Sequence, residues 1–263
     1  MEKGFTLIIP LYNKDKSILV TLNSVLINHG DYPFKCIVVD DDSTDNSSII
    51  AESFDICYPN VFQYYKIKHH GNKTPVFARN VGIKLCETKY IGFLDADDEL
   101  CPGFIDRACN FLDEHPEYSM YTNGHRMRII NDNGEITESS RNYSFNNVND
   151  FIDCLYAGAQ DISFCSSVYL TDYVKDNLFI DVYGEDSIFK LKYIYKHPNI
   201  YVDNSTCESI IWNTQHSGSY KWSKQKTNET PIIEVFNTLK NELPGFKYDF
   251  IPIENNRIQI WEK

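Results

Sequence analysis

Residues 5–45 read FTLIIPLYNKDKSILVTLNSVLINHGDYPFKCIVVDDDSTD and contain two short apolar runs with a helical pattern between them. The runs at 5–9 and 36–39 have the length of buried strands, and the segment 17–27 carries apolar side chains at helical spacing. A strand, a helix and a second strand in this order predict two parallel strands joined by a crossover helix.

The same alternation continues to residue 94. Apolar runs recur at 61–67 and 90–94, and helical patterns lie at 45–54 and 79–86. Strands and helices that alternate in this way form a mostly parallel sheet with helices on both faces. The sequence therefore predicts an α/β fold whose ligands bind at the carboxyl ends of the strands.

The pattern changes after residue 100, and no internal repeat is visible. We predict a loop over 217–230, which is polar and rich in lysine. The other expected elements are helices over 102–114, 151–156, 186–195 and 231–243, strands over 164–170 and 208–212, and a hairpin turn at 131–134.

Composition excludes several classes of protein. Hydrophobic residues make up 42% of the chain and aromatic residues 14%, which supports a packed core and argues against disorder or a coiled coil. With 25 Lys+Arg and 37 Asp+Glu, the net charge is 25 − 37 = −12. Because a negative surface repels phosphates, nucleic acid is not an expected partner.

The chain is expected to be cytoplasmic. The five apolar residues before Pro10 are too few for a signal peptide, and no apolar run reaches the length of a membrane span. Eight cysteines occur without a CxxC pair, so we expect buried, reduced thiols rather than a zinc site.

Acidic residues follow the strand expected at 90–94. Asp95, Asp97 and Asp98 would repel one another unless a cation lies among them, and Mg²⁺ or Mn²⁺ takes oxygen ligands of this kind. The alternative is a solvated acidic turn that caps the next helix. Neither GxGxxG nor GxxxxGK[ST] is present, so a bound nucleotide would be held without these phosphate loops.

Four segments resemble the successive signatures of the family-two inverting glycosyltransferases: 5–13, 38–45, 78–82 and 90–98. The resemblance implies a GT-A fold, a Rossmann-like and mostly parallel sheet flanked by helices, with acceptor-side loops. It divides the chain into a GT-A domain at 1–220, with a nucleotide-sugar-binding half at 1–100 and an acceptor-binding half at 101–220, and a C-terminal helical extension at 221–263.

The resemblance also implies site residues, although Tyr12 and Asp41 taken alone could be ordinary packing and turn residues. Asp42 stands where the family usually has glycine, and Thr214 where it usually has arginine. The implied nucleotide-sugar-binding residues are Pro10, Tyr12, Asn13, Asp41, Arg79, Asn80, Asp95, Ala96 and Asp97, and the implied metal residues are Asp97, Asp98 and His216.

A further signature lies at 183–189, which resembles the family's Glu-Asp motif ahead of a helix. The resemblance implies that Asp186 is the catalytic base, supported by Glu185. An inverting transfer needs one carboxylate to remove the proton of the acceptor hydroxyl. Taken alone, two acids at a helix N-terminus would equally suit the helix dipole.

Together these features predict a metal-dependent inverting glycosyltransferase that uses Mg²⁺ or Mn²⁺ and a nucleotide-diphosphate sugar, with a UDP-sugar favoured. The resemblance further implies that the acceptor is a glycan or a lipid-linked hydroxyl in surface polysaccharide synthesis, with peripheral contact at the inner face of the membrane. The alternatives are a non-catalytic binder of sugar nucleotides or glycans and a phosphotransferase built on a DxD motif. The oligomeric state is left open.

Overall fold

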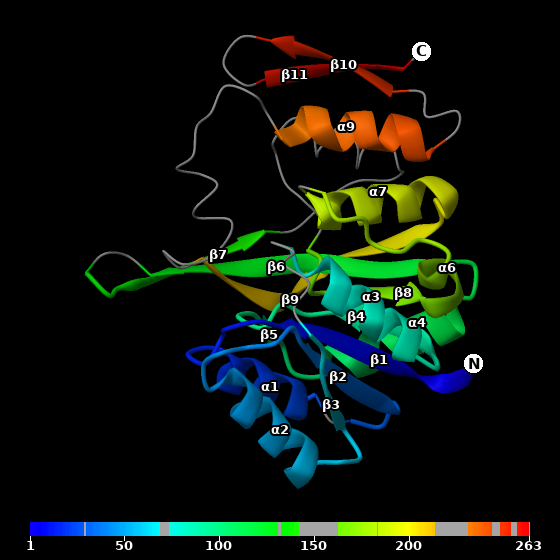
Figure 1. Ribbon diagram of the computed structural model, residues 1–263. Coiled ribbons are helices and arrows are strands. Elements are labelled where there is room, and N and C mark those ends of the chain that lie inside the picture. The colour runs from blue at the N-terminus through cyan, green and yellow to red at the C-terminus, as the bar shows by residue number, and fades with distance from the viewer. Residues whose placement is uncertain are drawn as a thin grey trace.

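The computed structural model contains a nine-stranded sheet with helices on both faces (Figure 1). The strand order is β3-β2-β1-β4-β8-β6-β9-β5, and β7 pairs with β6. The structure describes residues 1–28, 30–68, 74–130, 133–141, 163–182, 184–213, 231–243, 248–253 and 257–262. Within these residues, no helix has the length and apolar character needed to cross a membrane.

The first part of the chain forms the parallel half of the sheet, as the sequence predicts. Strand β1 lies between β2 and β4 and is parallel to both, so the three carboxyl ends meet at one edge. The elements are β1 (Glu2–Leu11), α1 (Ile18–Leu26), β2 (Phe34–Asp40), α2 (Ser47–Cys57), β3 (Phe62–Lys66), α3 (Val76–Leu85) and β4 (Thr88–Phe93).

The second part makes the sheet mixed, because β8 runs antiparallel to both β4 and β6. The predicted parallel pairing holds for β1 to β4 and recurs between β6 and β9, whereas β5, β7 and β8 pair antiparallel. The elements are β5 (Glu99–Leu100), α4 (Phe104–Glu114), β6 (Met120–Ile130), β7 (Ile136–Arg141), β8 (Ser167–Leu170), α6 (Thr171–Lys175), α7 (Glu185–Lys196) and β9 (Ile200–Asn213).

Two expectations for this part can be compared with the structure, and a third cannot. The hairpin is confirmed, since β6 and β7 are antiparallel and Ile130 pairs with Ile136. The helix expected from Pro102 begins later, because Gly103 adopts a left-handed φ of 76° that helical residues do not take. The helix expected at 151–156 lies outside the described residues.

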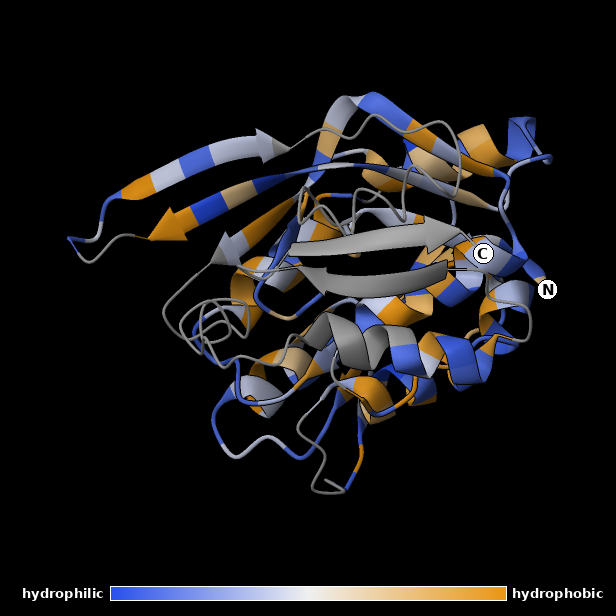
Figure 2. Cartoon of the chain, turned by 90° about the horizontal axis from the view of Figure 1, so that it is seen from above, coloured by the Kyte–Doolittle hydropathy of each residue, from blue (hydrophilic) through white to orange (hydrophobic). Residues whose placement is uncertain are grey.

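The β6–β7 hairpin projects from the body of the molecule. Figure 2 shows hydrophobic residues where the two strands meet the turn and mostly hydrophilic residues further along them. Ile130 and Ile136 are 38% and 55% exposed.

The C-terminal extension contains the expected helix and also a hairpin that the sequence prediction missed. Helix α9 (Pro231–Glu242) is followed by the antiparallel strands β10 (Tyr248–Ile253) and β11 (Arg257–Glu262). Helix α9 lies over α7, with the hairpin beyond it (Figure 1). An ion pair between Lys192 and Glu242, 3.0 Å long, joins α7 to α9.

Two hydrophobic clusters cover the two faces of the sheet. Because side chains alternate along a strand, Phe5, Leu7 and Ile9 of β1 face one cluster while Ile8 faces the other. The first cluster includes residues of α1, α2 and α4, and the second includes residues of α3, α6, α7 and α9. Helices α3 and α7 are thus packed on the same face of the sheet, which brings their polar residues together at its carboxyl edge.

Candidate active site

The loops after β1 and β2 are joined by side-chain hydrogen bonds. The backbone N–H of Asn13 donates to the Ser43 hydroxyl (3.0 Å), and the Asn13 side-chain oxygen accepts from the backbone N–H of Thr44 (2.8 Å). The backbone N–H of Lys14 donates to the Ser47 hydroxyl (2.7 Å). These contacts join the loops that follow β1 and β2, residues 12–17 and 41–46, into one unit, which we call the rim.

Asp40, the last residue of β2, stabilises this rim through hydrogen bonds from the protein interior. It is fully buried and accepts hydrogen bonds from the Ser48 hydroxyl, the Tyr64 hydroxyl (2.7 Å) and the backbone N–H of Ser43 (2.8 Å). Burial by itself raises the pKa of Asp40, but these hydrogen bonds outweigh it and the pKa falls below the ordinary value. Asp40 therefore stays charged and serves the structure of the loop.

Two residues of the rim adopt a left-handed backbone although neither is glycine. Among the described residues, only Asn13 (φ 50°) and Asp42 (φ 63°) do so without being glycine. Asp42 is the position where the resembled family has glycine, and its conformation explains that preference. Its carboxylate pairs with Lys66 at the end of β3, at 3.3 Å.

The other expected donor-site residues of β1 and β2 lie at the same edge. Pro10 is buried and pairs with Val39 of β2, whereas Tyr12 is 47% exposed. Asp41 is 7% exposed. The backbone N–H of Asp41 donates to the carbonyl of Leu11 (2.8 Å), so the residues that follow β1 and β2 are neighbours.

The acidic loop after β4 places its carboxylates in different surroundings. Asp95 accepts a hydrogen bond from Arg79 (2.7 Å), and Asp97 is paired with Lys14. Between them, Ala96 is buried, and its carbonyl accepts from the Ser17 hydroxyl (3.0 Å) at the start of α1. The loop is thus fixed to both α1 and α3.

Asp98 points into the protein. One carboxylate oxygen accepts from the backbone N–H of Trp212 (3.0 Å), and the other accepts from the Cys165 thiol (3.2 Å). Burial raises the pKa of Asp98 well above its ordinary value, and the charges of Asp95 and Asp97 raise it further.

This acidic group fits a divalent cation. Potential ligand atoms of Asp95, Asp98 and Cys165 lie within 4.8 Å of one another. The neighbouring Asp97 carboxylate forms an ion pair with Lys14. Several carboxylates in partial burial require compensating positive charge, and oxygen ligands suit Mg²⁺ and Mn²⁺. His216, the third expected metal residue, lies outside the described residues.

The first turn of α7 carries the second acidic pair. Gly184 precedes the helix with a φ of 70°, so the chain turns sharply and places Glu185 and Asp186 at the helix N-terminus. Partial burial raises the pKa of Asp186, but Lys190 and Arg79 lower it more, and the net pKa is below the ordinary value. For Glu185, burial and the charge of Asp186 raise the pKa despite Arg79. The two neighbouring carboxyl groups therefore differ in acidity, with the pKa of Glu185 raised and that of Asp186 lowered.

Arg79 of α3 connects the two acidic sites. Its side chain is only 3% exposed, and its guanidinium donates to Asp95 (2.7 Å) and to Glu185 (3.1 Å). The guanidinium carbon lies 4.7 Å from the ring centre of Phe164 and 5.3 Å from that of Phe179. One cation thus spans the acidic loop of β4 and the N-terminus of α7.

Asn80 secures the same junction. Its side-chain amide donates to the carbonyl of Phe179 (2.9 Å), and its side-chain oxygen accepts from the backbone N–H of Phe179 (3.0 Å). Asn80 therefore holds the segment that leads into α7.

Sequence reasoning did not single out four residues that complete these contacts: Lys14, Cys165, Lys190 and Trp212. Lys14 and Trp212 reach the acidic loop from distant parts of the chain, and Cys165 resembles an ordinary buried thiol. Only Lys190 carried a local signal, because it follows Asp186 by one helical turn.

Comparison with known proteins places the chain in a family. The model for Glycosyl transferase family 2 matches residues 6–177, which include the strand-end loops and the acidic loop. This chain belongs to glycosyl transferase family 2. The resemblance inferred from the four sequence segments is thereby confirmed.

Two similar proteins are named for teichoic acid biosynthesis and for glycosyl transfer to poly(ribitol-phosphate). The minor teichoic acid biosynthesis protein GgaB of Bacillus subtilis (strain 168) is 37% identical over 112 residues, which are 42% of this chain and 12% of the relative. The poly(ribitol-phosphate) beta-N-acetylglucosaminyltransferase TarS of Staphylococcus aureus (strain Mu50 / ATCC 700699) is 35% identical over 115 residues, 42% of this chain and 19% of the relative. This family-two chain therefore matches only a small part of each relative.

Solved structures confirm the GT-A fold. S. aureus TarS 1–349 in complex with UDP-GlcNAc superposes with a TM-score of 0.66 at 23% identity, covering 90% of this chain and 65% of that chain. The mannosyltransferase PcManGT from Pyrobaculum calidifontis, in complex with GDP-Man and Mn²⁺, gives a TM-score of 0.57 at 14% identity, covering 90% and 69%.

Proposed function

We propose that this family-two chain is a metal-dependent inverting glycosyltransferase domain. It transfers a sugar from a nucleotide-diphosphate sugar to a hydroxyl of a cell-surface glycan or lipid-linked acceptor. Family membership supports the reaction class, and the names of GgaB and TarS support the cell-surface setting. A UDP-sugar is the favoured donor, because the TarS structure holds UDP-GlcNAc, with a GDP-sugar as the alternative.

The observation that carries the proposal is the acid pair at the start of α7. Arg79 joins this pair to the acidic loop of β4, so a base and a donor site share one edge of the sheet. The pKa of Asp186 is lowered, largely by the positive charges that outweigh its burial, so Asp186 is ionised at neutral pH. An ionised carboxylate can accept the proton of the acceptor hydroxyl as that oxygen attacks the anomeric carbon.

The remaining residues have proposed roles on the donor. The ring of Tyr12 stacks on the base, the Asp41 carboxylate accepts from a ring N–H, and Asp95 accepts from ribose hydroxyls. Pro10, Asn13 and Ala96 shape the backbone around them, and Arg79 and Asn80 support the pocket from behind.

Asp97 and Asp98 are the proposed holders of Mg²⁺ or Mn²⁺, with His216 completing the set. When bound, the cation neutralises charge that develops on the leaving diphosphate. Lys14, which is paired with Asp97, supplies a second positive charge at the same place. This concentration of positive charge is how a chain of net charge −12 would accept an anionic donor.

A transfer assay tests the proposal. The purified chain is incubated with UDP- and GDP-sugars, Mn²⁺ and teichoic-acid or lipid-linked acceptors, and the product linkage is determined by NMR. Transfer with inversion supports the proposal. Nucleotide binding without transfer would favour the non-catalytic alternative, and phosphate transfer would favour the phosphotransferase.

A further inference from the structure

Arg79 is shared between two carboxylates that come from distant parts of the chain. Asp95 follows β4, whereas Glu185 begins α7 and is 106 positions from Arg79 in the sequence. The guanidinium has little freedom to leave, because its side chain is 3% exposed and lies against the rings of Phe164 and Phe179. Among the described residues, its Nε atom is buried and has no hydrogen-bond partner.

The two carboxylates differ in how they face solvent. The Asp95 side chain is 41% exposed and can therefore meet a ligand, whereas the Glu185 side chain is 15% exposed. A ligand hydroxyl that donates to Asp95 competes with Arg79 for the same oxygen atoms. The charge that Arg79 withdraws from Asp95 is then available to Glu185 and to the neighbouring Asp186.

We propose that Arg79 is a positioning residue that couples occupancy of the donor pocket to the placement of the acid pair on α7. With the pocket empty, Arg79 divides its hydrogen bonds between Asp95 and Glu185. With Asp95 engaged by the donor's ribose, Arg79 binds Glu185 more fully and fixes the first turn of α7. The base is thereby held in place only when a donor is present. This inference rests on the proposed function, because it takes Asp95 as a donor contact and Asp186 as the base.

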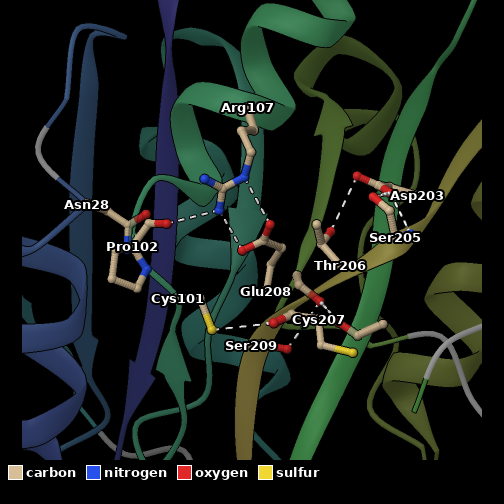
Figure 3. Close-up of polar contacts among 12 residues, drawn as sticks. Asn28, Cys101, Pro102, Arg107, Asp203, Ser205, Thr206, Cys207, Glu208 and Ser209 are labelled. Atoms are coloured by element: carbon tan, nitrogen blue, oxygen red, sulfur yellow. Dashed lines mark hydrogen bonds and ion pairs between the residues drawn. The ribbon is translucent and has the colours of Figure 1, made fainter. Parts of the chain in front are cut away.

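The geometry favours coupling over a purely structural bridge. A second arginine bridge in the same chain provides the comparison: Arg107 donates to both oxygens of Glu208 (2.9 and 2.6 Å) and joins α4 to β9 (Figure 3). Its third hydrogen bond goes to the carbonyl of Pro102 (2.9 Å), so within the described part of the chain Arg107 has no second carboxylate to exchange with. Arg79 instead uses its two terminal guanidinium nitrogens on two different carboxylates, which differ in solvent exposure.

A double-mutant cycle on nucleotide affinity tests the coupling. UDP and GDP are titrated calorimetrically with Mn²⁺ into the wild type, Glu185→Gln, Arg79→Met and the double variant. Glu185→Gln preserves size and is expected to weaken nucleotide binding by about fivefold or more when Arg79 is present, since coupled sites typically differ by that much. In the Arg79→Met background the same substitution should leave the affinity unchanged.

Two further variants separate positioning from loss of folding. Arg79→Lys keeps the charge but lacks the planar fork, so the effect of Glu185→Gln should shrink while the chain stays folded. Arg107→Met removes the control bridge and should lower the melting temperature without changing the effect of Glu185→Gln.

The outcomes are distinct. An equal effect of Glu185→Gln in both Arg79 backgrounds, with the wild type still binding nucleotide, would overturn the coupling and leave the proposed function standing. Failure of the wild type to bind UDP or GDP would overturn the proposed function and the coupling with it.

Discussion

The ammonium group of Lys14 is paired with the carboxylate of Asp97 and joins the loop after β1 to the acidic loop after β4. Lys14 also donates its backbone N–H to Ser47 at the start of α2 (2.7 Å). The ammonium group of Lys14 therefore extends from a fixed backbone toward Asp97, a proposed metal ligand. A divalent cation held by Asp97, as proposed above, would compete with Lys14 for this carboxylate.

Removal of this competitor should strengthen metal binding. We expect Lys14→Met to bind Mn²⁺ more tightly than the wild type in the absence of nucleotide, by about three- to tenfold, the value of one partly exposed charge contact. Titration calorimetry measures the change. Lys16→Met, which removes an exposed lysine two positions further on, is the matched control and should bind Mn²⁺ like the wild type. Weaker Mn²⁺ binding by Lys14→Met would show that Lys14 is not a competitor.

Metal removal should in turn weaken nucleotide binding. In the proposed function Asp95 and Asp97 of the acidic loop face a negatively charged diphosphate, and a bound divalent cation would make that approach favourable. We expect UDP affinity to fall by about tenfold or more in EDTA and to return when Mn²⁺ is restored. Undiminished UDP affinity in EDTA would leave the metal role without support.

The left-handed conformation of Asp42 gives a prediction for stability. A side chain at this φ costs about 1 kcal/mol relative to glycine. Asp42→Gly and Asp42→Ala both lose the contact with Lys66, so they differ only in the Cβ atom. Asp42→Gly should be more stable than Asp42→Ala by about 1 kcal/mol in urea unfolding. Equal stability would mean that the loop relaxes to another conformation.

Asp113 predicts how the stability of the fold depends on pH. Although burial raises its pKa, hydrogen bonds from Lys89, Lys3 and Tyr90 lower it to about 2. A carboxyl group whose pKa is lower in the folded state than in the unfolded state stabilises the fold at pH values above its unfolded pKa. This contribution is lost as the pH falls from about 4 to 2. Its size is about 2 kcal/mol.

The measurement compares urea unfolding of the wild type and Asp113→Asn at several pH values. The variant should be less stable near neutrality and should approach the wild type at the acid end. A constant difference over the whole range would contradict the assigned pKa.

The parallel half of the sheet could be predicted from the sequence because its signals are local. The strands near 5–9 and 36–39 are short apolar runs, and each is separated from the next by a helical pattern. The mixed half could not, because β8 becomes antiparallel through its pairing with β4 and β6, a choice made by distant residues. The C-terminal hairpin was missed for a different reason. The residues 254–256 between its two strands contain no strong turn dipeptide.

The candidate site divides in the same way. The acids at 95–98 and 185–186 could be selected from their motifs, but their partners could not. Arg79 was expected near the nucleotide and in the structure donates to Asp95 and Glu185, an arrangement set by the packing of α3 and α7 on one face of the sheet. The pairing of Lys14 with Asp97 depends on the same kind of long-range geometry.

The role of Asp186 is the central claim, and one comparison tests it most directly. Sugar transfer and UDP affinity are measured side by side for the wild type and Asp186→Asn, with Mn²⁺ present. Because the substitution removes the base but keeps the size of the side chain, we expect the transfer rate to fall by about 10²- to 10⁴-fold while UDP affinity is retained. Transfer by Asp186→Asn at the wild-type rate would contradict the account.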